Sequence, residues 1–270
     1  MSKFSGVLLV TDLDGTLLDN EHEVTRGNME ALRRFIDGGG LFTIATGRSR
    51  VGAESVRIHL PINTAAILSN GGVVYNYATG EYVHIEYMDE KAMGIADVIL
   101  AKFPRMGVEV ICKDTKYCIN RGLAIQAHFD YVCCTGVDIT SPSDVTEPWV
   151  KLLAVDLPSR LQPLGQWLIP TYGGQLEVCY SAPTILEVQN KGTHKGAGLT
   201  RLMRHLGIGK EHTYACGDND NDVSMLGEVY SFAPRNASES ARNAANVIGP
   251  GNCEDFMAYV VEQLDERYAP

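Results

Sequence analysis

Short apolar runs alternate with helical spacings along the first part of the chain. Mainly apolar residues fill 7–10, 41–45 and 65–68, and runs of this length are typical of buried strands. Between the first two runs, apolar residues recur at the spacing of a helix, at Met29, Leu32, Phe35 and Ile36. This alternation of strand and helix predicts a parallel α/β sheet.

Caps and breakers set the expected helix boundaries. Thr25 is placed to cap the first helix, and Gly38–Gly40 to end it, because glycine readily adopts the left-handed turn that closes helices. Pro61 is expected to close a second helix. The stretch from Cys253 to Leu264 predicts a last amphipathic helix.

The pattern differs in the middle of the chain. Residues 73–77 and 81–85 flank Ala78–Gly80 and predict a hairpin. Strand-like runs follow at 107–112, 150–155 and 175–180, with helical stretches near 123–132 and 160–168 between them. We expect these strands to be exposed on one face, as in an α+β module.

The strand–helix alternation resumes after the middle region. A helix is expected to open at Thr193–Gly196 and to stop at Gly207, and a strand is expected over 213–216. We therefore predict a core domain made of residues 1–83 and 188–270, interrupted by an inserted α+β domain over 84–187.

Composition narrows the class of protein. A chain of 270 residues with 45% hydrophobic residues can bury a sizeable core, and a net charge of −10 disfavours nucleic acid and anionic membranes as partners. We find no signal peptide and no apolar run long enough to span a bilayer. The seven cysteines are odd in number and form no C-x-x-C pair, which favours free thiols in a reducing cytoplasm.

Two carboxylates, Asp12 and Asp14, follow the first predicted strand directly. Like charges this close raise each other's pKa unless a cation lies between them, so the pair indicates a metal site or an acid/base pair. Other polar residues follow later strands or begin helices: Thr46, Lys195, Asp218 and Asp222.

These residues are expected to meet, because ligands of open parallel sheets bind at the carboxyl ends of the strands. Carboxylates from two strand ends suit a hard cation such as Mg²⁺. A hydroxyl, a lysine and helix-start N–H groups suit a phosphate. The combination indicates phosphoryl chemistry.

The motifs also resemble those of a known superfamily. Asp12–Thr16 matches DxDGT, Thr46 matches the hydroxyl of a second motif, Lys195 the lysine of a third, and Gly217–Asp222 matches GDxxND. The chain thus resembles the haloacid dehalogenase superfamily, in particular its Cof-type, sugar-phosphatase-like branch with a large C2B-type cap. The resemblance implies a Rossmann-like core with an inserted α+β cap domain. The pair Asn70–Gly71 is also frequent in that branch.

The resemblance implies a role for each matched residue. Asp12 would be the nucleophile and Asp14 the general acid and base, with Mg²⁺ held by Asp12, the Asp14 carbonyl and Asp218. Asp222 would orient the site without touching the metal. The remaining matches are assigned to phosphate or substrate binding: Thr46, Lys195 and Asn221 for phosphate, and Asn70 and Gly71 for substrate.

Several alternatives stay open at this stage. Thr46 could also cap the following helix, Asn70 could be a left-handed turn residue, and Lys191 competes with Lys195. The leading hypothesis is a Mg²⁺-dependent phosphomonoester hydrolase that acts on a small phosphorylated metabolite, first a sugar phosphate, through an aspartyl-phosphate. A hexose-phosphate phosphomutase and a non-catalytic phospho-ligand-binding protein are the alternatives.

Overall fold

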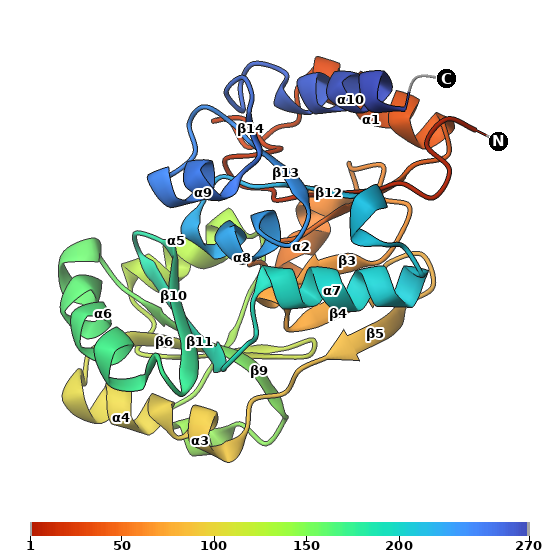
Figure 1. Ribbon diagram of the computed structural model, residues 1–270. Coiled ribbons are helices and arrows are strands. Elements are labelled where there is room, and N and C mark those ends of the chain that lie inside the picture. The colour runs from red at the N-terminus through yellow and green to blue at the C-terminus, as the bar shows by residue number, and fades with distance from the viewer. Residues whose placement is uncertain (1, 269–270) are drawn as a thin grey trace. The chain divides into compact units, whose positions relative to one another are not determined.

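The computed structural model describes residues 2–268, and the chain divides into two compact units (Figure 1). Within the described residues, the core unit runs up to Thr46, from Val56 to His84, and onward from His194. The inserted unit comprises Ile85–Thr193 together with Gly47–Ser55. The prediction of an insertion over 84–187 did not include this short segment, which follows Thr46 in the chain.

A parallel sheet forms the centre of the core unit. Its strand order is β14-β13-β12-β1-β2, and all neighbours run parallel. The strands are β1 (Leu8–Thr11), β2 (Leu41–Ile44), β12 (Thr213–Cys216), β13 (Tyr230–Ala233) and β14 (Val247–Ile248). The strands β1 and β12 pair with each other, and all of their residues are buried, as is typical of parallel strands.

A second, three-stranded sheet in the core unit has the order β3-β4-β5. An isolated parallel bridge between Ala45 and Ile67 connects its first strand to the end of β2. Its elements are β3 (Ala66–Leu68), the 3₁₀ turn η1 (Ser69–Gly71), β4 (Val73–Asn76) and β5 (Glu81–Ile85). The hairpin predicted around Ala78–Gly80 is therefore present.

Helices cover the core unit, with α1 and α10 packed side by side (Figure 1). The longer helices are α1 (Arg26–Asp37), α7 (Lys195–Leu206) and α10 (Phe256–Arg267), and the shorter ones are η3 (Lys210–His212), η4 (Asp220–Asp222), α8 (Val223–Leu226) and α9 (Glu239–Ala244). Helix α2 (Arg50–Arg57) begins in the inserted unit and ends in the core unit, because the boundary lies between Ser55 and Val56.

The residues that flank two helices explain why one predicted helix is correct in its boundaries and the start of another is wrong. Thr25 accepts a hydrogen bond from the backbone N–H of Asn28, and α1 ends at Asp37 with Gly38 as its C-cap, both as predicted. The last helix was predicted to begin at Cys253 but begins at Phe256. Asp255 has a φ of 53°, and a residue in this left-handed conformation cannot be part of a right-handed helix.

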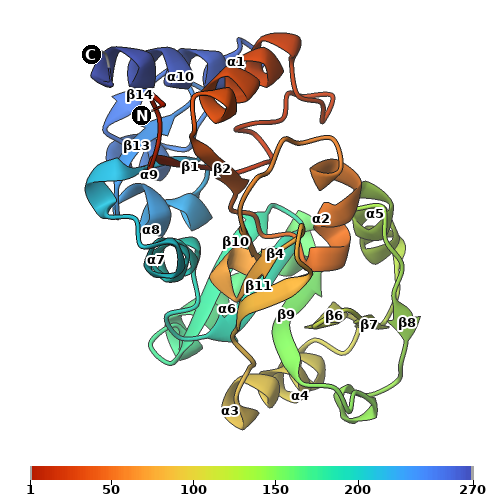
Figure 2. The same ribbon diagram turned by 90° about the vertical axis from the view of Figure 1, so that its right-hand side faces the viewer.

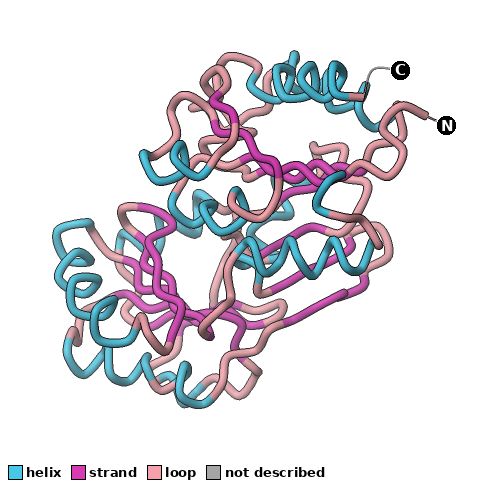
Figure 3. The backbone as a smooth tube through the Cα atoms, in the orientation of Figure 1, coloured by secondary structure: helices cyan, strands magenta, loops and turns pink. Residues whose placement is uncertain are grey.

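The inserted unit is built on a six-stranded sheet with the order β10-β11-β9-β6-β7-β8 (Figure 2). Its strands are β6 (Gly107–Cys112), β7 (Lys116–Ile119), β8 (Val137–Asp138), β9 (Trp149–Val155), β10 (Leu176–Ala182) and β11 (Ile185–Asn190). Its helices are α3 (Glu90–Met93), α4 (Ile95–Lys102), α5 (Leu123–Tyr131), η2 (Pro142–Asp144) and α6 (Pro158–Tyr172). All neighbouring strands are antiparallel except β7 and β8. Figure 3 colours the strands magenta and the helices cyan.

The expectation that these strands expose one face is wrong for β6 and β9, whose residues are all buried. One face packs against an apolar cluster that includes α4 and α6, and the other is covered partly by α5. Charged residues of these strands have polar partners. Lys151 lies 2.8 Å from Glu187 of β11, and Glu109 lies 2.7 Å from His128 of α5.

The segment Gly47–Ser55 is held in the inserted unit by specific contacts. Lys151 Nζ donates a hydrogen bond to the carbonyl of Gly47 at 2.6 Å. Arg50 forms an ion pair with Asp114 at 2.5 Å. These contacts explain why the segment joins the inserted unit although it directly follows Thr46.

Among the described helices, none is both long and apolar enough to cross a membrane.

Candidate active site

The parallel register brings the predicted residues to one edge of the sheet. Thr11, the last residue of β1, is aligned with Cys216 of β12 and with Ile44 of β2. The backbone N–H of Asp12 donates to Cys216 at 2.9 Å, and that of Ala45 to Thr11 at 2.8 Å. Asp12 and the residues after β2 and β12 therefore leave the sheet at neighbouring strand ends.

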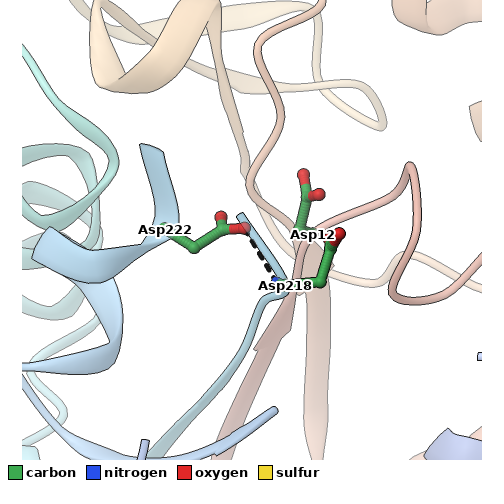
Figure 4. Close-up of side chains that lie close together, drawn as sticks. All are labelled: Asp12, Asp218 and Asp222. Atoms are coloured by element: carbon green, nitrogen blue, oxygen red, sulfur yellow. Dashed lines mark hydrogen bonds between the residues drawn. The ribbon is translucent and has the colours of Figure 1, made fainter. Parts of the chain in front are cut away.

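Three carboxylates gather at this edge. Asp12, Asp218 and Asp222 each offer an oxygen, and these oxygens lie within 4.8 Å of one another (Figure 4). Asp222 uses both of its oxygens inside the protein. One accepts from Lys195 at 2.6 Å, and the other accepts from the backbone N–H groups of Asp218 and Asn219 at 3.0 Å. Asp12 and Asp218 each have one oxygen bonded inside the protein, to Lys195 and to Thr16, so the second oxygen of each is the one that could bind a cation.

Lys195 is the cation of this cluster. It is the first residue of α7, its side chain is 1% exposed, and its Nζ lies 2.7 Å from Asp12 and 2.6 Å from Asp222. Burial alone would lower the pKa of Lys195, but the two carboxylates outweigh burial and raise its pKa above the ordinary value. Lys195 is therefore charged.

Burial also acts on the acids. It raises the pKa of Asp12 well above its ordinary value, in part opposed by Lys195. For Asp218, burial and the nearby Asp222 raise the pKa to about 6. The negative charge of Asp14 contributes to both shifts. A divalent cation between Asp12 and Asp218 would favour their ionised forms, because opposite charge stabilises a carboxylate.

Several contacts support Asp218 and the loop after β1, and the sequence did not predict them. Gly15 and Thr16 belong to the DxDGT motif, but their contacts appear only in the structure. Thr16 donates its hydroxyl to Asp218 at 2.7 Å. Gly15 has a φ of 85°, and a Cβ there would lie 2.5 Å from an oxygen of Asp218, so only glycine fits. Asn236 donates to the carbonyl of Gly15 at 2.9 Å. Asn236 belongs to no motif, and only the folded structure brings it to this loop.

The phosphate and substrate candidates lie on loops beside the cluster. Thr46 is buried, and its carbonyl accepts from the backbone N–H of Asn70 at 3.0 Å. Asn221 donates its side-chain amide to that of Asn70 at 3.1 Å. Asn70 is a left-handed turn residue, with a φ of 50°. The substrate contacts assigned to Asn70 and Gly71 stay a prediction.

The structure decides two of the alternatives that the sequence left open, the capping role of Thr46 and the choice between Lys191 and Lys195. The residue that accepts a bond at the start of α2 is Ser49, whose hydroxyl accepts from the N–H of Gly52, so Thr46 is not at a capping position. Lys191 is 52% exposed and bonds to Glu177 and to the carbonyl of Gly173 in the inserted unit. The structure therefore brings Lys195 to the carboxylates and gives Lys191 other partners.

Comparison with models of protein families identifies the family of this chain. A family model described as haloacid dehalogenase-like hydrolase matches residues 9–261. The chain belongs to this family. The match and the phosphatases among its relatives confirm the expected Cof-type haloacid dehalogenase membership and the fold of a parallel-sheet core with an inserted α+β domain.

Relatives of this haloacid dehalogenase-like hydrolase include curated phosphatases. It is 29% identical to the 5-amino-6-(5-phospho-D-ribitylamino)uracil phosphatase YwtE of Bacillus subtilis, over 95% of this chain and 97% of the relative. It is 28% identical to the HMP-PP phosphatase of Escherichia coli O6:H1, over 97% of both chains. The chain thus belongs to a hydrolase family in which curated relatives are named phosphatases.

Two further matches complete the comparison. A haloacid dehalogenase-like hydrolase from Bacteroides thetaiotaomicron has a solved structure with a TM-score of 0.83 and 25% identity, and the match covers 96% of this chain and 99% of that one. The chain is also 28% identical, over 95% of its length, to a chloroplastic endoribonuclease YBEY of Arabidopsis thaliana. It spans only 46% of that protein.

Proposed function

We propose that this protein is a Mg²⁺-dependent phosphomonoester hydrolase that acts through an aspartyl-phosphate on Asp12. The observation that supports this most is the cluster of three acids at the strand ends, with Lys195 bonded to Asp12 and Asp222. The cluster combines a buried carboxylate nucleophile with a fixed positive charge beside it, and aspartyl-phosphate chemistry needs both.

The residues present fit Mg²⁺. The donors are carboxylate oxygens of Asp12 and Asp218, to which we add the backbone carbonyl of Asp14, and hard oxygen donors are what Mg²⁺ prefers. Asp222 would hold Lys195 and the Asp218 backbone in place rather than bind the ion. When bound, Mg²⁺ would reduce the repulsion between the Asp12 carboxylate and an incoming phosphate.

The chain's own residues then carry the reaction. An oxygen of Asp12 attacks phosphorus, so an O–P bond forms to Asp12 while the bond to the leaving oxygen breaks. Asp14 donates a proton to that leaving oxygen. In the second step Asp14 takes a proton from a water molecule, whose oxygen attacks phosphorus and releases inorganic phosphate and a free Asp12.

Lys195, Thr46 and Asn221 would bind the oxygens of the transferring phosphoryl group. Stabilising charge where it develops is the main contribution that a protein makes to phosphoryl transfer. Lys195 is suited to this because its ammonium group is already held against Asp12 at 2.7 Å. The Thr46 hydroxyl would serve as a neutral donor at the end of the neighbouring strand.

The substrate we propose is a small phosphorylated metabolite, with a sugar phosphate as the first candidate. Two relatives support the class, since their names specify small phosphorylated compounds. The inserted domain, proposed over 84–187, would select the leaving group. We place the protein in the cytoplasm, because seven cysteines, an odd number without a C-x-x-C pair, suit a compartment in which thiols stay reduced.

The decisive experiment is phosphate release from para-nitrophenyl phosphate and a panel of phosphorylated metabolites, with and without Mg²⁺. Asp12→Asn should lower kcat by at least about 1,000-fold, because an amide cannot replace the nucleophile. Its melting temperature should stay close to or above that of the wild type, since one buried charge is removed. A wild-type protein without Mg²⁺-dependent phosphate release, or an Asp12→Asn variant with unchanged kcat, would contradict the proposal.

A further inference from the structure

The turn Ser69–Gly71 joins β3 to β4 through three consecutive residues with positive φ. The φ values are 50° for Ser69, 50° for Asn70 and 91° for Gly71. The first two residues carry a Cβ, which makes this conformation unfavourable for them, and both are almost fully buried. Residues held in such backbone conformations concentrate at functional sites, where the surroundings enforce them.

The turn makes direct bonds to two loops that carry candidate phosphate-binding residues. The backbone N–H of Asn70 donates to the carbonyl of Thr46 at 3.0 Å. The side-chain oxygen of Asn70 accepts from the amide of Asn221 at 3.1 Å. One residue thus connects the loop after β2 with the loop after β12.

The turn also packs against the start of α7, the helix that begins with Lys195. A Cβ on Gly71 would lie 2.2 Å from the carbonyl oxygen of His194, and a Cβ on Gly198 would lie 2.8 Å from the Cα of Gly71. The two backbones therefore touch through glycines on both sides. Any side chain at position 71 would displace the residue that precedes Lys195.

We propose that Ser69–Gly71 is a positioning element that fixes Thr46, Asn221 and Lys195 relative to one another. This inference rests on the proposed function, because it assigns the turn to the binding of the phosphoryl group. In this role Asn70 and Gly71 act through other residues, and the role does not require that they touch substrate. A small displacement of phosphate-binding groups is enough to lower kcat strongly, since reacting atoms must be aligned closely.

The test compares Gly71→Ala with Gly207→Ala. Both glycines have positive φ, at 91° and 67°, so alanine strains the backbone at each. Gly207 follows the other end of the same helix, and a Cβ there meets nothing within 4 Å. The control therefore reproduces the backbone strain without displacing the start of α7.

We would measure kcat and KM for para-nitrophenyl phosphate, and the inhibition constant of inorganic phosphate, well below each melting temperature. Gly71→Ala should lower kcat about 100-fold and weaken inhibition by phosphate, whereas Gly207→Ala should keep both near wild type. A folded Gly71→Ala variant with the kcat and inhibition constant of Gly207→Ala would overturn the inference.

A second pair of variants covers the case in which Gly71→Ala does not fold. Asn70→Gly keeps the left-handed turn and its N–H but removes the oxygen that accepts from Asn221. Asn120→Gly is its control, because Asn120 also has a positive φ, of 55°, and also bonds through its side chain, to carbonyls of the inserted unit. Asn70→Gly should weaken inhibition by phosphate about 10-fold and Asn120→Gly should not; equal values for the two would refute the role of Asn70.

Failure of the proposed function can be told from failure of this inference. If the wild type releases no phosphate from any substrate, the proposed function fails on its own. The same variant pairs are then compared for binding of inorganic phosphate with Mg²⁺, measured as the shift in melting temperature. Equal shifts within both pairs would overturn the inference, and a smaller shift only in the turn variants would support it.

Discussion

Lys195 holds its ammonium group between Asp12 and Asp222 in a fully buried position. Three carboxylates, Asp12, Asp218 and Asp222, oppose this one ammonium, so the cluster has a net negative charge when all are ionised. The nearby negative charge of Asp14 adds to it. The residual charge gives a physical reason for a metal here that is independent of any motif.

Replacement of Lys195 tests how strongly the cluster depends on its cation. Lys195→Met should lower the free energy of unfolding by about 3 to 5 kcal/mol, because two buried carboxylates lose their partner. Lys191→Met is the matched control and should change it by less than about 1 kcal/mol, since Lys191 is half exposed. Urea unfolding of both variants measures the difference. Equal losses in the free energy of unfolding would contradict the assignment of Lys195 as the partner of the two buried carboxylates.

The sequence alone located the acids but not their supports. Asp12 and Asp218 could be predicted because each follows an apolar strand, and parallel strands bring such residues to one edge. The bond from Asn236 to Gly15 and the contact of Gly71 with His194 could not. Both depend on the path of the folded chain between residues far apart in sequence, and no local pattern encodes that path.

At the scale of elements, the main error was the prediction that the strands of the inserted unit expose one face. Charged residues within those strands caused it. Lys151 on β9 and Glu187 on β11 look solvent-exposed in the sequence, since charged residues are seldom fully buried. In the structure each is buried because it faces the other at 2.8 Å. A charge pair across neighbouring strands is invisible until the strand order is known.

A double-mutant cycle tests this pair. Lys151→Met and Glu187→Met should each lower the free energy of unfolding by about 3 to 5 kcal/mol, because each leaves one uncompensated buried charge. The double variant should lose less than the sum of the two, since a pair of apolar side chains leaves no charge behind. Additive losses in chemical unfolding would show that the two charges are not coupled.

At the scale of the molecule, the two units have separate apolar clusters, and the carboxylates lie in only one of them. Mg²⁺ should therefore raise the melting temperature of the core unit and leave the transition of the inserted unit unchanged. At 100 times its dissociation constant, a ligand that binds only the folded state adds about 2.7 kcal/mol.

Calorimetry with MgCl₂, against a NaCl control of equal ionic strength, would measure this shift. Asp218→Asn should abolish it, because the variant loses one of the two acids that we assign to the ion. A Mg²⁺-dependent shift that persists in Asp218→Asn would place the ion elsewhere.

The central strand β1 is flanked by β2 on one side and by β12 on the other, and 202 residues separate Thr16 from its partner Asp218. During synthesis on the ribosome, at about 5 to 20 residues per second, β1 therefore waits for at least about 10 seconds before its second neighbour exists. The inserted unit can fold within that interval, whereas one edge of β1 stays without its native partner. The nascent chain is thus most open to misassembly, and to chaperone binding, while its carboxylate cluster is still incomplete.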